Sequence, residues 1–184
     1  MTQALNMDKL AKWIGREERT VDTITAGLIA RFQATLGSGL FGLHWCLAPP
    51  TVSIDDVGLD GHPKKGGFLP PVPLQYRMWA AGEIMFLSPI PNAGEVERHS
   101  VIEDVTFKEG RTGPLVFVNI LHRYSANKVQ LLSEQQTIVY KETATAAKVE
   151  PSAPFVADFE KVLKTDPVLL FRYSALTFNG YGAH

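Results

Sequence analysis

Residues 115–124 read LVFVNILHRY and give the strongest strand signal in the chain, because apolar, β-branched and aromatic side chains dominate them. Turn-forming residues bound this run on both sides, at 108–113 (KEGRTG) and at 125–128 (SANK). A second candidate strand, residues 129–140, follows the later turn, and a third, residues 97–107, precedes the earlier one. Three long strands joined by two tight turns predict an antiparallel meander.

Two more strand candidates lie upstream of this meander. Residues 79–87 and residues 40–47 are both rich in apolar and aromatic side chains, and prolines follow each run closely. Within residues 97–107 the side chains alternate, with Glu103 as the exception. The face that this alternation predicts as shared holds His99, Val101, Val105 and Phe107. We expect a sheet of four or five strands.

Two helices are predicted before these strands. Asn6 can cap a short first helix that ends at Gly15. Residues 22–36 predict a longer helix, because apolar side chains recur every four positions. This repeat runs through Ile24, Leu28, Phe32 and Leu36. The predicted fold class is therefore α+β, with one long helix packed on a strongly curved antiparallel sheet.

Residues 51–74 predict a long loop between the upstream strands. Four glycines and four prolines leave no room for a regular element there. Loops of this length inside a compact domain are often functional or mobile. We expect this loop to form the rim or lid of a site rather than a catalytic centre.

Composition and charge exclude several classes of partner. The chain of 184 residues has a net charge of −1 and 20% charged residues, which makes nucleic acid and anionic membranes poor candidates as partners. No apolar run approaches the ~20 residues that span a bilayer, and the N-terminus has no apolar signal core. The single cysteine, Cys46, is typical of a reducing compartment and predicts a cytoplasmic protein.

No cofactor or metal site is predicted. The histidines and the lone cysteine show no metal-ligand spacing, and no glycine-rich phosphate-binding motif is present. Cys46, His44 and His122 lie within predicted strands and are interpreted as packed residues rather than catalytic ones. His62 lies in the long loop, and His99 on an exposed strand.

The end of the chain, residues 166–184, reads DPVLLFRYSALTFNGYGAH. Asp-Pro favours extended backbone, so the apolar run 168–171 predicts a short buried strand. Polar side chains follow at close spacing, including Tyr173 and Ser174. Before this stretch, residues 142–165 predict a linker that contains a short amphipathic helix. The apolar surface of residues 168–184 predicts a dimer or higher oligomer.

Three segments of the chain carry a resemblance to a known family. Residues 102–118 (IEDVTFKEGRTGPLVFV), 69–80 (LPPVPLQYRMWA) and 134–140 (EQQTIVY) resemble the N-terminal half of double hot-dog, MaoC-like hydratases. These include mesaconyl-CoA hydratases and type 2 hydroxyacyl-thioester dehydratases. The run 169–179 (LLFRYSALTFN) is similar to the entry into their second, catalytic hot dog.

The resemblance implies a domain organisation. It implies a hot-dog fold over residues 1–141, a linker at 142–165, and the start of a second hot dog at 166–184, whose remainder the sequence lacks. His184 falls on the position of the family's catalytic histidine, whereas Tyr181 and Gly182 depart from the family pattern.

The resemblance also implies an activity, the reversible addition of water to an enoyl thioester. In that chemistry His184 activates the water as a base and Asn179, five residues earlier, positions it. Tyr173, Ser174 and Arg77 are the candidate substrate-binding residues, and Lys64 and Lys65 can meet the phosphates of CoA. The expected substrate is an acyl-CoA or an acyl-carrier thioester.

Two other functions remain open. The chain can be a catalytically silent subunit that binds acyl thioesters while another hot-dog chain supplies the active site. It can also be a hot-dog thioesterase, for which Asp22 is the candidate carboxylate at a helix start. The hydratase and the silent subunit are each compatible with a homodimer or with a hetero-oligomer that contains a second hot-dog chain.

Overall fold

The computed structural model describes residues 5–37, 39–111, 113–143 and 162–180. Along the chain it holds α1 (Met7–Ala11), β1 (Glu17–Ile24), α2 (Ala26–Leu36), β2 (Tyr76–Phe86), β3 (Gly94–Gly110), β4 (Gly113–Ala126), β5 (Val129–Lys141) and α3 (Pro167–Leu176). Two short 3₁₀ helices, η1 (Leu43–Cys46) and η2 (Ile54–Asp56), interrupt the segment between α2 and β2. No helix of this described part is long and apolar enough to cross a membrane.

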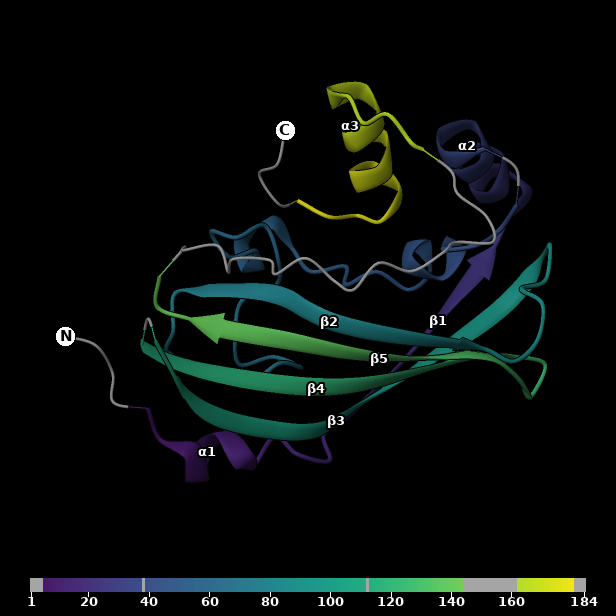
Figure 1. The fold of residues 1–184 in the computed structure, drawn as a ribbon. Coiled ribbons are helices and arrows are strands. Elements are labelled where there is room, and N and C mark those ends of the chain that lie inside the picture. Colours follow the sequence, from purple (N-terminus) through teal and green to yellow (C-terminus); the bar gives the residue numbers. More distant parts are fainter. Residues whose placement is uncertain (1–4, 38, 112, 144–161, 181–184) are drawn as a thin grey trace, which may run out of the picture.

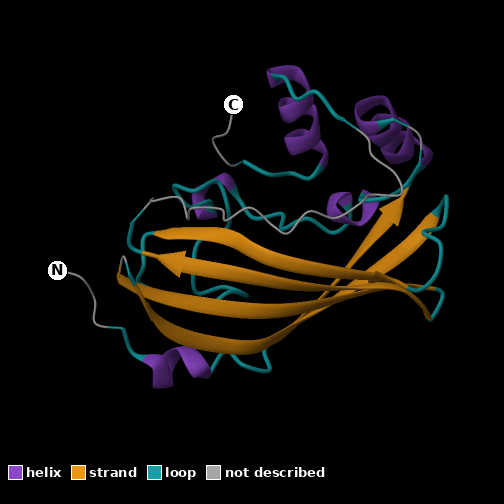
Figure 2. Ribbon diagram, in the orientation of Figure 1, coloured by secondary structure: helices purple, strands orange, loops and turns teal. Residues whose placement is uncertain are grey.

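The five strands form one antiparallel sheet in the order β1-β3-β4-β5-β2. The sheet is strongly curved, and α2, α3 and the loops before β2 lie over one side of it (Figure 1). Loops and the two short 3₁₀ helices lie along the sheet on that side, with α2 and α3 above them in this view (Figure 2). We call this covered side the concave face.

The predicted meander is confirmed as β3, β4 and β5. Its second hairpin turns at Asn127 and Lys128, whose φ angles of 50° and 65° are those of a turn that matches the twist of the flanking strands. Its first hairpin turns between Gly110 and Gly113, and Gly113 has φ of 113°. The predicted strand at 79–87 is also confirmed, as β2.

The alternation predicted for residues 97–107 is broken by a β-bulge at Glu103. Ile102 pairs with Ile120 and Asp104 pairs with Asn119, so Glu103 is an extra residue in β3. The bulge reverses the parity of the side chains after it. His99 and Val101 therefore lie on the outer face, opposite to Val105, and the predicted shared face was wrong.

The long helix is shorter than predicted. Residues 22–24 belong to β1, where they pair with β3, and the helix begins at Ala26. Thr25 caps it by accepting a hydrogen bond from the backbone N–H of Leu28 at 3.1 Å. The β-branched residues of β1 favour a strand, and pairing along β3 outweighs the four-residue apolar repeat.

The strand predicted at residues 40–47 was also wrong. The segment forms η1, after Gly42 turns the chain with φ of 87°. Leu43, His44 and Cys46 are all buried. The apolar run reflects burial of a tight turn on several sides, and a run of this length does not distinguish a helical turn from a strand.

Helix α3 replaces the strand predicted at residues 168–171. Asp166 caps the helix by accepting from the backbone N–H of Leu169 at 2.8 Å, and Pro167 occupies its first turn. Asp-Pro here is a helix start, with proline where its missing N–H is harmless. The amphipathic helix predicted around Phe155 and Phe159 lies outside the described residues, whereas Val162 and Leu163 are exposed and precede α3.

Two apolar clusters occupy opposite ends of the concave face. One packs α2 and η1 on the sheet and contains Ile24, Phe32, Leu43, Cys46, Leu47, Val96, Tyr124, Ala126, Leu131 and Leu132. The other packs α1 and the segment before β2 and contains Leu10, Val72, Leu74, Ile102, Val105, Val116, Val118, Ile120 and Tyr140. The predicted loop at 51–74 spans the space between them, with η2 as its only regular element.

The first cluster provides a test of the fold. We expect Leu132→Ala to lower the free energy of unfolding by about 2–5 kcal/mol, because this fully buried side chain leaves a cavity. Val129→Ala, in the same strand but 53% exposed, is the matched control and is expected to change it by less than ~0.5 kcal/mol. Denaturant titration measures both values, and equal losses would contradict this description of the core.

Candidate functional site

A cavity of about 800 Å³ lies between the concave face and the loop before β2. Its wall includes side chains from β1, β3, β4 and β5, from η1, and from residues 49–69. Thr177, just after α3, also lines it. The volume is in the range of small-molecule sites, which makes this cavity the candidate functional site.

Strand register places a row of polar side chains on the floor of the cavity. Ser100 of β3 pairs with His122 of β4, and His122 pairs with Glu134 of β5. One step along the strands, Arg98 pairs with Tyr124. Paired residues of an antiparallel sheet point to the same face. We call Arg98, Ser100, His122, Glu134 and Gln136 the polar belt, since it separates the two apolar clusters.

His122 is the centre of the polar belt. Its Nδ1 lies 2.7 Å from Ser100 Oγ, and its Nε2 lies 3.4 Å from Gln136 Oε1. Burial, together with the positive charge of Arg98, lowers the pKa of His122 to about 4, although the hydrogen bond to Gln136 opposes the shift. The imidazole is therefore neutral at pH 7, with Nε2–H donating to Gln136 and Nδ1 accepting from Ser100.

His44 and Glu134 form a buried pair beside the belt. Trp45 Nε1 donates to Glu134 Oε1 at 3.0 Å, and His44 Nε2 lies 3.8 Å from Glu134 Oε2. Burial raises the pKa of Glu134. Burial, followed by the charge of His122, lowers the pKa of His44 to about 4. Both shifts favour the uncharged form, so this contact is not a strong ion pair.

Arg98 carries the charge of the belt. Its side chain is 14% exposed, and its Nη2 donates to Glu18 Oε1 at 3.3 Å. Its Nε is buried and has no acceptor among the described residues. A guanidinium offers five N–H donors in a planar fork, so this contact with Glu18 leaves donor capacity in the cavity wall.

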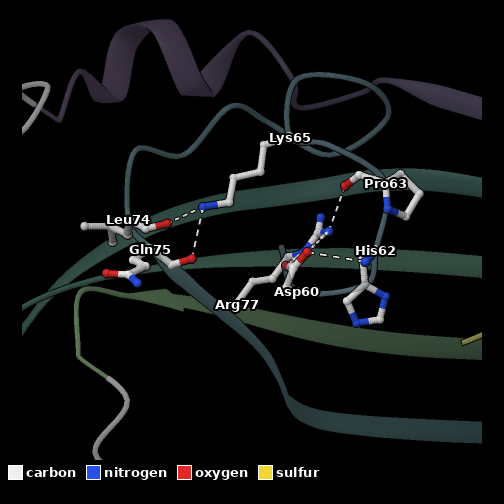
Figure 3. A network of polar contacts seen from close by, with 7 residues as sticks. All are labelled: Asp60, His62, Pro63, Lys65, Leu74, Gln75 and Arg77. Atoms are coloured by element: carbon white, nitrogen blue, oxygen red, sulfur yellow. Dashed lines mark hydrogen bonds and ion pairs between the residues drawn. The ribbon is translucent and has the colours of Figure 1, made fainter. Parts of the chain in front are cut away.

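A second polar network fixes the loop at the other side of the cavity (Figure 3). Arg77 Nε donates to Asp60 Oδ2 at 2.5 Å, Nη2 donates to Asp60 Oδ1 at 3.0 Å, and Nη2 also donates to the Pro63 carbonyl at 2.7 Å. The Asp60 carboxylate also accepts from the backbone N–H of His62 at 3.3 Å. Arg77 lines the cavity, but its fork is already used to hold residues 60–63 against β2.

The two loop lysines are tied to backbone carbonyls. Lys65 Nζ donates to the carbonyl oxygens of Leu74 and Gln75 (Figure 3). Lys64 Nζ donates to the carbonyl oxygen of Asp55. Burial lowers the pKa of Lys65, with the charge of Arg77 acting in the same direction. Both lysines line the cavity, so the predicted loop forms its rim and is anchored there.

The described site candidates at the end of the chain are not among the residues that line the cavity, although the neighbouring Thr177 is. Tyr173 is half-buried, and burial followed by the nearby Cys46 and Glu134 raises its pKa to about 12. Ser174 accepts from the backbone N–H of Asn179 at 2.8 Å through its carbonyl. A Cβ on Gly180 would lie 3.1 Å from the Gly61 carbonyl oxygen, so this segment touches the loop. His184 lies outside the described residues.

The structure also shows the surroundings of two other residues named from the sequence, Cys46 and Asp22. Cys46 is buried, and burial raises the pKa of its thiol to about 11, so the interpretation as a packed residue is confirmed. Asp22 lies in β1 and not at a helix start. Its Oδ2 accepts from the backbone N–H of Ala48 at 2.7 Å, and its Oδ1 from Thr23 at the same distance.

The polar belt is the part of the site that the sequence did not predict. No sequence motif marks Arg98 or Ser100, His122 is predicted to be a packed residue, and Glu134 and Gln136 carry only the family resemblance. A signal existed, since Arg98/Ser100, His122/Tyr124 and Glu134/Gln136 each stand two positions apart in adjacent strands. Only the strand register brings the three pairs to one face.

Residues 42–184 match the family of type 2 hydroxyacyl-thioester dehydratases. The chain belongs to this family. It is also 35% identical to the mesaconyl-C(4)-CoA hydratase of Chloroflexus aurantiacus over 94% of this chain. The chain spans 66% of the length of that relative.

Solved structures share the fold of this family member. A MaoC-like dehydratase from Phytophthora capsici is similar with a TM-score of 0.60 and 14% identity, over 97% of this chain and 66% of that one. HtdX of Mycobacterium tuberculosis is similar with a TM-score of 0.53 and 18% identity, over 89% and 61%. These similarities confirm the predicted α+β hot-dog fold.

The two buried histidines predict acid sensitivity. Below pH 6.5 the unfolded chain protonates His44 and His122, whereas the folded protein resists protonation down to about pH 4. Stability is therefore full above pH 6.5 and falls with pH in that window, by up to about 1.4 kcal/mol per pH unit for each histidine. The raised pKa of Glu134 opposes part of this loss.

Urea titrations between pH 7 and pH 5 measure this slope. We expect His122→Gln to reduce it, because the variant removes one group that protonates only on unfolding. His99→Gln is the matched control, since His99 lies on the outer face in a contact with Glu17 at 2.9 Å. An unchanged slope in His122→Gln would contradict a neutral, buried His122.

Proposed function

We propose that the chain acts in the reversible hydration of enoyl thioesters, with acyl-CoA as the substrate class and with lyase chemistry. Water adds across the C2–C3 double bond, so that the hydroxyl joins C3 and a proton joins C2. The observation that carries the proposal is the 35% identity to a mesaconyl-C(4)-CoA hydratase over nearly the whole chain. A cavity of about 800 Å³ on the concave face supports it by providing room for an acyl group.

The proposed catalytic residues are His184 and Asn179. Hydration needs a base that removes a proton from water and a residue that orients that water. The segment that follows α3 supports the assignment, because Thr177 lines the cavity and Gly180 lies against the loop at Gly61. Asn179 lies between these two residues in the sequence, five positions before His184.

The proposed substrate-binding residues are Tyr173, Ser174 and Arg77. The contacts of Arg77 with Asp60 and Pro63 favour an indirect role, in which Arg77 holds the loop that forms the rim. Half-burial of Tyr173 beside Glu134 and Cys46 favours a position against the acyl group.

We further propose the domain organisation that the family resemblance implies. Residues 1–141 form a first hot dog, residues 142–165 a linker, and residues 166–184 the start of a second hot dog. The cap at Asp166 supports a new unit there, because it starts a helix after residues 162–165, which have no regular secondary structure. The cytoplasmic location stays a proposal that rests on the single, buried Cys46.

A second candidate function is that of a silent binding subunit whose catalytic residues come from another hot-dog chain. The pKa of His122, which lines the cavity, favours this function. His122 has a pKa of about 4 and is a weak base at neutral pH. A thioesterase is less favoured, because the Asp22 carboxylate already accepts two backbone hydrogen bonds.

Enzyme assays separate these functions. We expect the purified chain to consume crotonyl-CoA and mesaconyl-CoA, measured as loss of the absorbance of the enoyl thioester. His184→Ala is expected to reduce the rate about 10²–10⁴-fold, because it removes the base. His99→Ala, on the outer face, is the control and keeps the rate.

Other results would change the assignment. Saturable binding of the acyl-CoA without turnover would support the silent binding subunit. Release of free CoA, measured with a thiol reagent, would support the thioesterase. Equal turnover in the wild type and His184→Ala would contradict the role of His184.

We also propose that the chain forms a homodimer or a hetero-oligomer with another hot-dog chain. Helix α3 supports this, because it is apolar around most of its circumference. Its Val168 and Phe171 are 63% and 64% exposed in the single chain. Apolar side chains on this scale favour burial by a partner.

Light scattering on the purified chain tests the association. We expect Val168→Asp to shift the protein toward the monomer, since a carboxylate is costly to bury in an apolar contact. Ile54→Asp, which changes an apolar side chain in η2 that is 82% exposed, is the control and keeps the oligomer. A monomeric wild type would contradict the proposal.

A further inference from the structure

The tip of the loop before β2 is a compact turn. We call residues 57–63 the loop tip, and an antiparallel bridge joins its two ends. Within it, the backbone N–H of Gly58 donates to the His62 carbonyl at 2.7 Å, and that of Gly61 donates to the Gly58 carbonyl at 3.0 Å. Because these bonds close the turn on itself, the loop tip keeps its shape when its contacts with the rest of the chain change.

A buried ion pair ties the loop tip to β2 (Figure 3). Asp60 accepts two hydrogen bonds from Arg77, whose side chain is 6% exposed. Although burial raises the pKa of Asp60, the hydrogen bonds and the positive charge of Arg77 lower it overall, so the carboxylate is ionised at neutral pH. Two charge-assisted bonds fix orientation as well as distance. Since β2 pairs with β5 along its length, the loop tip is anchored to the sheet.

The segment that follows α3 reaches this loop tip. The helix ends with the backbone N–H of Asn179 donating to the Ser174 carbonyl at 2.8 Å, and Phe178 has φ of 53°. Glycine is the usual residue at the left-handed position of such a helix end. A phenylalanine is unfavourable there, so contacts beyond the helix must hold the turn. Gly180 makes one, because a Cβ added to it would lie 3.1 Å from the carbonyl oxygen and 3.7 Å from the Cα of Gly61.

We propose that Asp60 is a positioning residue, which sets the place of the segment after α3 through the backbone contact between Gly61 and Gly180. That segment begins at Thr177, which lines the cavity, and it includes the proposed catalytic residue Asn179. The role in the reaction rests on the proposed function. Asp60 acts through the loop tip and makes no contact with the substrate.

The order of these contacts predicts what is lost when the ion pair is broken. The loop tip keeps its internal bonds but loses its anchor on β2, so the segment after α3 shifts with it. The floor of the cavity is unchanged, because β3, β4 and β5 hold it independently of the loop. Misplacement of a reacting group lowers the rate of the chemical step more than it lowers binding. We therefore expect kcat to respond and KM to stay nearly constant.

Hydrogen exchange on the full chain tests the coupling without depending on turnover. We expect Asp60→Asn to speed exchange in residues 174–180 about tenfold, as the loss of a charge-assisted hydrogen bond provides, while β4 keeps its wild-type rates. Asp55→Asn is the matched control and keeps all rates. It removes another carboxylate of the same loop, which is exposed and does not line the cavity.

A second variant disturbs the same contact from the other side. In Gly180→Ala the added Cβ presses on a backbone oxygen, so we expect faster exchange in the loop tip although Asp60 is unchanged. This variant also decides the proposal if Asp60→Asn does not fold. Gly27→Ala is the matched control, because its Cβ would press only on the flexible end of Arg31.

Kinetics with crotonyl-CoA test the role in the reaction. We expect Asp60→Asn and Gly180→Ala each to lower kcat about 10–100-fold and to keep KM within about threefold. Because both act through one contact, the double variant is expected to lose no more than the weaker single variant. Asp60→Glu keeps the carboxylate and is expected to restore most of kcat. The variants Asp55→Asn and Gly27→Ala keep kcat.

The outcomes separate this inference from the proposed function. Wild-type exchange in residues 174–180 of a folded Asp60→Asn overturns the positioning role and leaves the proposed function intact. Faster exchange with unchanged kcat, or losses of kcat that multiply in the double variant, overturn it as well. A wild type without turnover overturns the proposed function, whereas exchange still decides whether Asp60 positions the segment. Faster exchange and losses of kcat that do not multiply support the positioning role.

Discussion

The register of β3, β4 and β5 is the constraint on which this structure depends. It aligns inward-facing residues of three adjacent strands, so that Ser100, His122 and Glu134 meet in the middle of the concave face. A shift of one residue in any strand would send its whole set of inward side chains to solvent. Apolar clusters at both ends of the strands oppose such a shift, because each buries side chains from all three strands. The stability of the sheet and the geometry of the cavity therefore have the same origin.

Burying a polar belt between two apolar clusters imposes an energetic cost that the fold offsets locally. His122 gives up its charge and bonds to Ser100 and Gln136, and Glu134 accepts from Trp45. Arg98 cannot give up its charge, since guanidinium stays protonated at any physiological pH. It is the member of the belt whose bonding is least complete. The belt therefore places one permanent positive charge among the polar groups that line the cavity.

The loop before β2 covers the part of the concave face that the longer predicted helix is expected to cover. Helix α2 has 11 residues and covers one end of the concave face, so the loop closes the rest. The network of Arg77 with Asp60 and Pro63 holds it in place. Because a loop exposes its own polar backbone and side chains, the space beneath it is better suited to a ligand than the space beneath a packed helix.

The sequence by itself determined the elements whose signals are local. The three-stranded meander, its turns, the cap at Asn6 and the family resemblance all follow from short segments of the chain. Local signals misassigned residues 22–24, 40–47 and 168–171, because short apolar runs occur in strands, turns and helices alike. The tertiary structure alone decided which side chains share the cavity. The bulge at Glu103 reverses the alternation of β3. A bulge is fixed by pairing with the neighbouring strand and not by local sequence preference. Arg98 and Ser100 therefore became part of a site only when β4 fixed the register of β3.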